Sequence, residues 1–403
     1  MINVQDFGAA GDGIADDAPA IQNALDQHRD VFIPYGRYNI GGTLKVHSGT
    51  RLTVHPHTVL KLADGAGRKW NDFLLTNAKP ESGDRDIEIC GGIWNGNQKA
   101  NRREPQIINP GAYGGVLVNF FNVENLLFRN LTLANAESYF SRFSRVRHFL
   151  VENIRFQSDE PRPNNDGVHL GGDCEHGLIR HLRGLTRGAP NDDIVALNAD
   201  DALDRVECYG QTCGPIRHVH IYDLEAVQCH TFVRMLSVDS PIEHITIDDV
   251  RGGCDISAIN MDAARGCLVP LFDENDPARQ TGVGAISHAR ASRFMVHKTE
   301  RNDIPLLRLE TRAAIIVTDF RRDPDADVSP EAPTLRTRYI ENHEVAVEGL
   351  NEEQKTMALE HSSAQISIES NAHRHNLGAK TTRGESLVVP GGDLARVSIR
   401  PLL

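Results

Sequence analysis

The feature that most restricts the folds open to this chain is an internal repeat of short apolar segments. Leu126–Leu131 is echoed 23 residues later by Phe149–Ile154, and His218–Asp223 is echoed 26 residues later by His244–Asp249. A second family of segments recurs at steps of 27, 38 and 26 residues. Its members are Val168–Leu170, Val195–Leu197, Val233–Met235 and Ile259–Met261. Self-similarity at a nearly fixed period indicates stacked structural units, each of which buries its apolar face against the next.

Two interleaved columns of short strands, with a rung of about 23 to 27 residues, predict parallel strands coiled into a β-helix. Alternate side chains of each strand would point into the coil and the others toward water. A β-propeller needs longer blades of about 40 to 45 residues. A sandwich would not keep a fixed spacing. The repeat therefore predicts an all-β chain.

One helix is expected near the N-terminus. Asp16 and Asp17 are suited to cap it, Pro19 fits its first turn, and apolar residues follow at helical spacing. We expect a single domain, because the strand repeat runs on without a linker. Its parts are an N-terminal cap over 1–30, confident rungs over 31–265, and further rungs with a loop-rich cap over 266–403.

The composition of the chain restricts the classes of partner that it is expected to bind. The chain has 43 Lys and Arg against 55 Asp and Glu, a net charge of −12. Non-specific nucleic-acid or membrane-surface binding needs a basic field, so we expect neither partner. The chain has no CxxC pair and no clustered spacing of ligand residues, so we expect no metal site. Because no leader segment is visible, we expect a cytoplasmic protein, or a secreted one if a leader has been removed.

The opening of the chain resembles the pectate-lyase-like superfamily of right-handed β-helices. The resemblance rests on Val4–Gly13, on Asp16-Asp17 with Ala20–Gln22, and on the first-rung pattern Ile33–Tyr38. It implies an all-β, right-handed parallel β-helix with a short N-terminal capping helix. This superfamily contains lyases, hydrolases, epimerases and phage tailspikes, so the resemblance predicts the fold more firmly than the chemistry.

Two further segments, Asn164–Val168 and Asn191–Leu197, resemble the Asn-Thr-Asp-Gly and Gly-Asp-Asp motifs of polygalacturonase-type enzymes, family 28 of the glycoside hydrolases. This resemblance covers about residues 1–265. It implies an inverting hydrolase of a pectin-like or related carbohydrate, monomeric and without a cofactor. In that reading Asp192 is the general acid, while Asp166 and Asp193 activate the attacking water.

The residues themselves support such chemistry. Aligning Val168 with Val195 by their inward positions brings Asp166 beside Asp193, with Asp192 one residue earlier in the turn. Neighbouring strands lie about 4.8 Å apart, and like charges that close cannot all ionise comfortably. One carboxyl would keep its proton, as a general acid requires. The alternative is that these aspartates only cap turns or bind calcium.

The Gly-His-Gly motif that follows the paired aspartates in family 28 is absent, and Cys213–Pro215 occurs instead. Continuing the strand register by one rung places His230 beside Asp192, so we predict that His230 replaces the missing catalytic histidine. His218 is the second choice, because it aligns with the other strand column.

The family's Arg-Ile-Lys motif, whose cations hold the sugar carboxylate, is also degraded. Arg234 takes the place of its Arg, but Leu236 occurs where Lys is expected. An Arg can clamp a carboxylate through two parallel hydrogen bonds. We assign Arg234 to substrate binding, together with Asn164 and with His169 one rung further along.

Two other functions remain open at this stage. A polysaccharide lyase would remove the proton next to a uronate carboxylate, usually with calcium, and form unsaturated products. A non-catalytic glycan-binding or tailspike-like β-helix would bind without forming any product. In that last case Asp166, Asp192 and Asp193 could all be replaced without effect.

Overall fold

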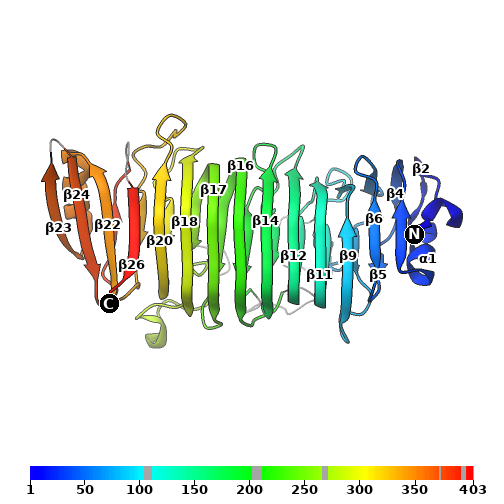
Figure 1. Ribbon diagram of the computed structural model, residues 1–403, viewed down its shortest axis with the longest axis horizontal. Helices are drawn as coiled ribbons and strands as arrows, with labels where there is room; N and C mark the ends of the chain where they lie inside the picture. Colours follow the sequence, from blue (N-terminus) through cyan, green and yellow to red (C-terminus); the bar gives the residue numbers. More distant parts are fainter. Residues whose placement is uncertain (104–110, 202–210, 266–270, 372–373, 392–395, 403) are drawn as a thin grey trace.

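The computed structural model describes residues 1–103, 111–201, 211–265, 271–371, 374–391 and 396–402. These residues form an elongated, all-β structure in which the strands lie side by side along the long axis (Figure 1). The helix α1 (Ala18–Gln27) lies at one end and the strand β23 (Gln365–Asn371) at the other. The all-β prediction is therefore confirmed.

One long series of parallel strands runs through the molecule. Its members in spatial order are β1 (Ile2–Asn3), β3 (Asp30–Ile33), β6 (Arg51–Val54), β9 (Asp84–Cys90), β11 (Val118–Ala134), β12 (Ser141–Gln157), β14 (Cys174–Gly184), β16 (Ile216–Leu236), β17 (Ile242–Met261), β18 (Ile286–Lys298) and β20 (Ala313–Arg322). The predicted registers occur, since Leu126 pairs with Phe149 and Val219 with Ile245.

A second parallel series is formed by β2 (Asp12–Asp16), β4 (Arg37–Ile40), β7 (Val59–Leu62) and β10 (Ile93–Asn95), and it joins the end of β11. A third series, which we call the site sheet, begins with β5 (Leu44–Val46) and β8 (Leu75–Asn77) and includes the first residues of β11 and β12. It continues through β13 (Val168–Leu170), β15 (Asp193–Asn198), the last residues of β16 and β17, β19 (Leu307–Leu309) and β21 (Leu335–Thr337).

The core lies between these series and follows from the alternation of side chains along each strand. In the site sheet, Val168 pairs with Val195, which pairs with Val233, and all three side chains are fully buried. Leu170 and Leu197 stack in the same way. Each rung thus adds an apolar layer directly on the previous one, and this stacking holds the rungs in register.

The expected N-terminal helix is present as α1, preceded by a short 3-10 helix at Val4–Phe7. Asp16 accepts a hydrogen bond from the N–H of Ala18, as a cap does. Asp17 instead accepts the backbone N–H of Ala10 at 2.6 Å and so holds the glycine-rich opening loop against the helix. In the described part of the chain, neither α-helix is long and apolar enough to cross a membrane.

After residue 265 parallel strands continue through β18 to β21, as expected, but antiparallel strands take the place of the expected loop-rich cap. After β21 the strands run antiparallel, comprising β22 (His343–Leu350), β23, β24 (Arg374–Thr381), β25 (Leu387–Val389) and β26 (Arg396–Pro401). The helix α2 (Glu352–His361) joins β22 to β23 and begins with a capping box at Asn351. A short 3-10 helix covers Pro277–Arg279. The last strand, β26, also pairs antiparallel with β20.

Candidate active site

The turn before β13 carries the first predicted motif. Asn164 has a left-handed backbone with φ of 54°, a conformation that Asn tolerates well. Asn165 is buried, and its side-chain amide donates to the Ser138 carbonyl at 2.5 Å. The backbone N–H of Gly167 donates to the Asp193 carbonyl at 2.8 Å. These bonds fix Asp166 next to Asp193 on the neighbouring rung, as the sequence predicted.

The next rung brings His230 to the same place. Asp193 pairs with Thr231, and the Thr231 N–H donates to the Asp192 carbonyl at 3.3 Å. Consequently His230 Nδ1 lies 3.4 Å from Asp192 Oδ1. His218 stacks on His244 at the other end of the strand β16. Of these two candidate histidines, His230 is therefore the one beside Asp192.

The three aspartates differ in their access to solvent. Asp166 and Asp193 are buried, whereas the Asp192 side chain is 18% exposed and that of His230 is 38% exposed. Asp193 Oδ1 has no hydrogen-bond partner among the described residues. A molecule arriving from solvent would therefore meet Asp192 and His230 first, with two further carboxyl groups behind them.

Burial and mutual repulsion control the protonation of this group. Burial, followed by the nearby charge of Asp166, raises the pKa of Asp192 to about 7, and Arg234 opposes this shift. Burial and the charges of Asp192 and Asp166 raise the pKa of Asp193 well above its usual range. Burial and Arg234 lower the pKa of His230 to about 4, so its imidazole is neutral near pH 7. The cluster thus holds at least one acidic proton at neutral pH.

His169 corrects one expectation. We expected it to bind substrate, but its side chain is fully buried and offers no atom to a ligand. Its Nδ1 lies 2.5 Å from Asp166 Oδ2 and its Nε2 lies 3.2 Å from Asp201 Oδ2, while Tyr139 stacks on the ring with centroids 4.2 Å apart. Burial alone would lower the pKa of His169, but Asp201 and Asp166 outweigh it and raise the pKa to about 9.

Arg234 lies in register with Ala196 and is 14% exposed. Its guanidinium Nη2 is 3.3 Å from Asp262 Oδ1, and Arg308 Nη1 reaches Asp262 Oδ2 at 3.1 Å. Asp262 thus holds both arginines in place, and Arg308 also pairs with Glu310 at 3.0 Å. Asn164 is half-buried, and its assignment to substrate binding stays a prediction.

Sequence reasoning missed Asp201 and Asp262. Each follows the end of a site-sheet strand, Asp201 three residues after Asn198 and Asp262 directly after Met261. The carboxyl ends of neighbouring parallel strands meet at one edge of a sheet. Acidic residues just past two such strands were therefore an available signal.

Asp192, Asp193 and His230 also have the spacing of a metal site, since one ligand atom from each lies within 4.8 Å of the others. Arg234, however, already places a positive charge close to both aspartates. The proton that burial retains on the pair further reduces its negative charge. Both effects weaken the attraction of this group for a cation.

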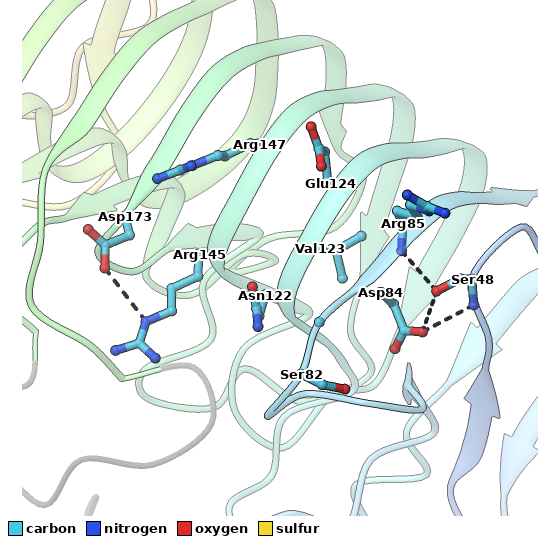
Figure 2. Close-up of a pocket in the computed structure, with 11 residues that line it drawn as sticks. Ser48, Ser82, Asp84, Arg85, Asn122, Val123, Glu124, Arg145, Arg147 and Asp173 are labelled. Atoms are coloured by element: carbon cyan, nitrogen blue, oxygen red, sulfur yellow. Dashed lines mark hydrogen bonds and ion pairs between the residues drawn. The ribbon is translucent and has the colours of Figure 1, made fainter.

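The pocket drawn in Figure 2 lies elsewhere. It has a volume of about 600 Å³ and is lined in part by residues of β9, β11 and β12. There Arg145 faces Asp173, and Ser48 donates a hydrogen bond to Asp84. None of the three site aspartates lines it. Its arginines and carboxylates largely neutralise one another, so it lacks the proton-holding carboxyl cluster that the site sheet provides.

Residues 1–100 match the family model described as rhamnogalacturonase A/epimerase, pectate lyase-like. This match confirms the resemblance seen in the opening segment. The matched residues comprise α1 and the first strands of the three series, and they end before the site aspartates. The match therefore supports the relationship in fold, and the residues that would determine the chemistry lie outside it, on later rungs.

Among known proteins, the preneck appendage protein of Bacillus phage PZA is 31% identical over 100 residues, which are 24% of this chain and 12% of that protein. A mannuronan C5-epimerase of Azotobacter vinelandii is 32% identical over 111 residues, which are 23% of this chain and 13% of that protein. The chain thus matches only a small part of each relative's length.

Among solved structures, a family 28 exopolygalacturonase of Yersinia enterocolitica superposes with a TM-score of 0.54 at 15% sequence identity, covering 80% of this chain and 71% of that one. At this identity the likeness concerns the fold alone. The chain therefore has a pectate-lyase-like fold related to those of polygalacturonases, epimerases and lyases.

Proposed function

We propose that this protein is a glycoside hydrolase of an anionic, pectin-like or related polysaccharide, and that its strands form a right-handed parallel β-helix. The observation that carries the proposal is Asp192, a partly exposed carboxyl with a pKa raised to about 7 beside two buried aspartates. A carboxyl that holds a proton at neutral pH, next to others that can accept one, is what glycoside hydrolysis requires.

In the proposed reaction, Asp192 donates its proton to the glycosidic oxygen as the bond from that oxygen to the sugar carbon breaks. A water held by Asp166 and Asp193 forms the new bond to the same carbon and passes a proton to the Asp166 carboxylate. The cationic His169 pairs with Asp166 and holds it in position. Inversion at the sugar carbon follows from the resemblance to family 28 and belongs to the same proposal.

The direct test is a panel of anionic polysaccharides, with products identified by NMR and by reducing-end assay. We expect new reducing ends without carbon–carbon double bonds, and no loss of activity in EDTA. The matched control is Asp325→Asn, since Asp325 is an exposed aspartate far along the chain, beyond β20. Equal activity of Asp192→Asn and the wild-type protein on a cleaved substrate would contradict the proposal.

Arg234 gives a prediction about substrate charge. Replacing it with Ala removes a charge-assisted hydrogen bond worth about 1.5–3 kcal/mol, so KM for a uronate substrate should rise by roughly 10- to 100-fold. We expect kcat to change much less, and Arg234→Lys to recover part of the affinity. The measurement is a pair of kinetic titrations with a uronate oligosaccharide and its methyl ester. An equal loss on both substrates would indicate a structural role instead.

A lyase or epimerase acting on a uronate glycan is the second candidate, and the similarity to a mannuronan C5-epimerase supports it. Both reactions begin by breaking the C–H bond next to the carboxylate. They therefore predict solvent deuterium in the product or an unsaturated product that absorbs ultraviolet light. Either result, in place of new saturated reducing ends, would replace the hydrolase proposal.

A further inference from the structure

Five histidines stack on consecutive rungs along one side of the molecule. We call them the histidine ladder; its members are His148, His176, His218, His244 and His288. Successive ring centroids lie 5.0, 5.0, 4.7 and 4.6 Å apart, and the ring planes differ by 4°, 2°, 6° and 19°. All five side chains are exposed.

Backbone geometry alone does not explain this choice of residue. Every ladder histidine has a left-handed backbone, with φ between 52° and 57°, and Asn or Asp fit such positions as readily as His. The same column contains Asn125 before the ladder and Ala314 after it. A second left-handed column mixes four residue types over seven rungs. Its members are Asn130, Asn153, His181, Asp223, Asp249, Arg293 and Asp319. An unbroken run of five imidazoles therefore points to a property of the imidazole itself.

One such property is metal binding. Neutral imidazole suits Zn²⁺, Ni²⁺ and Cu²⁺, and a zinc–nitrogen bond is about 2.0–2.1 Å long, so one tetrahedral ion spans two nitrogens about 3.4 Å apart. Neighbouring ladder rings have centroids 4.6 to 5.0 Å apart and are nearly parallel, so two of them must rotate toward one another to share an ion, and their exposed positions leave them free to do so. Rings two rungs apart, at roughly 9.6 Å, cannot share an ion. Adjacent pairs are therefore the binding units, with water completing the coordination.

The surroundings leave room for an ion. A groove of about 570 Å³ runs beside the ladder and is lined by His218, His244 and His288, with His220 on its wall. The neighbouring carboxylates are engaged elsewhere, since Arg217 pairs with Glu175 at 3.4 Å and with Glu243 at 2.7 Å. The groove is also lined by Arg290 and by the hydroxyls of Thr246 and Ser287, so among its described lining residues the imidazoles are the side chains with a nitrogen lone pair to offer an ion.

We propose that adjacent imidazoles of the histidine ladder bind divalent transition ions, Zn²⁺, Ni²⁺ or Cu²⁺, two imidazoles to each ion. None of the proposed catalytic residues belongs to the ladder. The metal-site proposal is therefore independent of the hydrolase proposal, and a binding measurement alone can test it.

The test compares two double variants that each replace two histidines with Asn, which fits the left-handed backbone. His176→Asn/His244→Asn leaves three histidines, none of them adjacent. His148→Asn/His288→Asn also leaves three, but all adjacent. Because losing the second imidazole removes the chelate advantage, we expect the first variant to bind Zn²⁺ about 100-fold more weakly than the second in calorimetric titration. The untagged first variant should also leave a Ni²⁺-chelate column early.

Both variants keep Asp192, Asp193 and His230, so any ion bound there contributes equally and cancels in the comparison. His361→Asn, which removes an isolated exposed histidine at the end of α2, should change nothing. Equal Zn²⁺ binding by the two double variants would overturn the proposal, as would a wild-type protein that binds no Zn²⁺. Activity toward polysaccharide is a separate readout and should be the same in both.

Discussion

Replacing Asp192 with Asn should abolish the proposed hydrolysis and, at the same time, stabilise the protein above neutral pH. A positioned general acid contributes roughly 10²- to 10⁴-fold to the rate, and Asn cannot donate an acidic proton to a leaving oxygen. We therefore expect kcat to fall by about 10³-fold. In the wild-type protein kcat should fall as pH rises through about 7, the pKa of Asp192, because the acid must be protonated to act.

The stability change follows from the same shift. The pKa of Asp192 rises from an ordinary 3.8 to about 7 on folding, so between these values the native state holds a proton that the unfolded chain releases. Stability therefore falls as pH rises through this range. One pKa unit corresponds to about 1.4 kcal/mol, so Asp192→Asn should gain about 2–4 kcal/mol above pH 7.

Thermal unfolding at several pH values measures this gain. The difference between Asp192→Asn and the wild type should be largest above pH 7 and shrink as pH falls toward 4, where both states are protonated. The Asp325→Asn control should show neither the gain nor its pH dependence. A variant that loses activity without any gain in stability at pH 8 would show that Asp192 is charged in the native protein, contrary to its proposed role as the acid.

Replacing His169 with Ala should be the most destabilising single change in the site. It would leave the buried carboxyl groups of Asp166 and Asp201 without their shared partner. Removing one member of a buried ion pair costs about 3–5 kcal/mol. Activity should also be lost, since Asp166 would no longer be held in position. Urea unfolding monitored by circular dichroism measures the cost.

His181→Ala is the matched control. His181 also lies 2.5 Å from a carboxylate, that of Asp223, but its side chain is 43% exposed. An exposed pair is worth about 0.2–1 kcal/mol, so this variant should lose far less stability. The pKa of His169 is raised from 6.5 to about 9. Its contribution is therefore complete below about pH 6.5 and is lost as pH rises through 9. Equal costs for the two variants would contradict this account.

The register of the site could be predicted from sequence because it depends on repetition. Val168, Val195 and Val233 occupy equivalent inward positions, and a slip by one residue would turn each apolar side chain toward water. Once these rungs are aligned, Asp166, Asp193 and the histidine beside them follow by counting. The prediction therefore needed only local pattern and parallel pairing.

The burial of His169 could not be predicted in the same way. Its position in the strand predicts an outward side chain, and the register with Arg234 is as expected. What buries the imidazole is Tyr139 stacked on its face and Asp201 at its far nitrogen, and these come from segments on different rungs. A periodic pattern predicts which way a side chain points, but it does not predict which residues of the next turn cover that side chain.

The antiparallel C-terminal strands escaped prediction for a related reason. β22 alternates buried and exposed residues in the same way as a parallel rung, because side-chain alternation is a property of a single strand. The direction of its partners is set by chain connection and by pairing over long distances, as between His343 and Thr381. Neither the chain connection nor the long-range pairing can be predicted from the local sequence.

The reversed final strands change the edge that the sheet presents beyond β20 and β21. A stack of identical parallel rungs ends in unpaired backbone groups that invite another chain to continue it into a fibril. Here β26 runs back along β20 and occupies that edge. The outermost strand left over, β23, pairs only with β24 among the described strands, and its side chains are mostly polar and exposed, including Gln365 and Glu369. The sheet therefore presents a polar, exposed antiparallel edge here in place of an apolar parallel one.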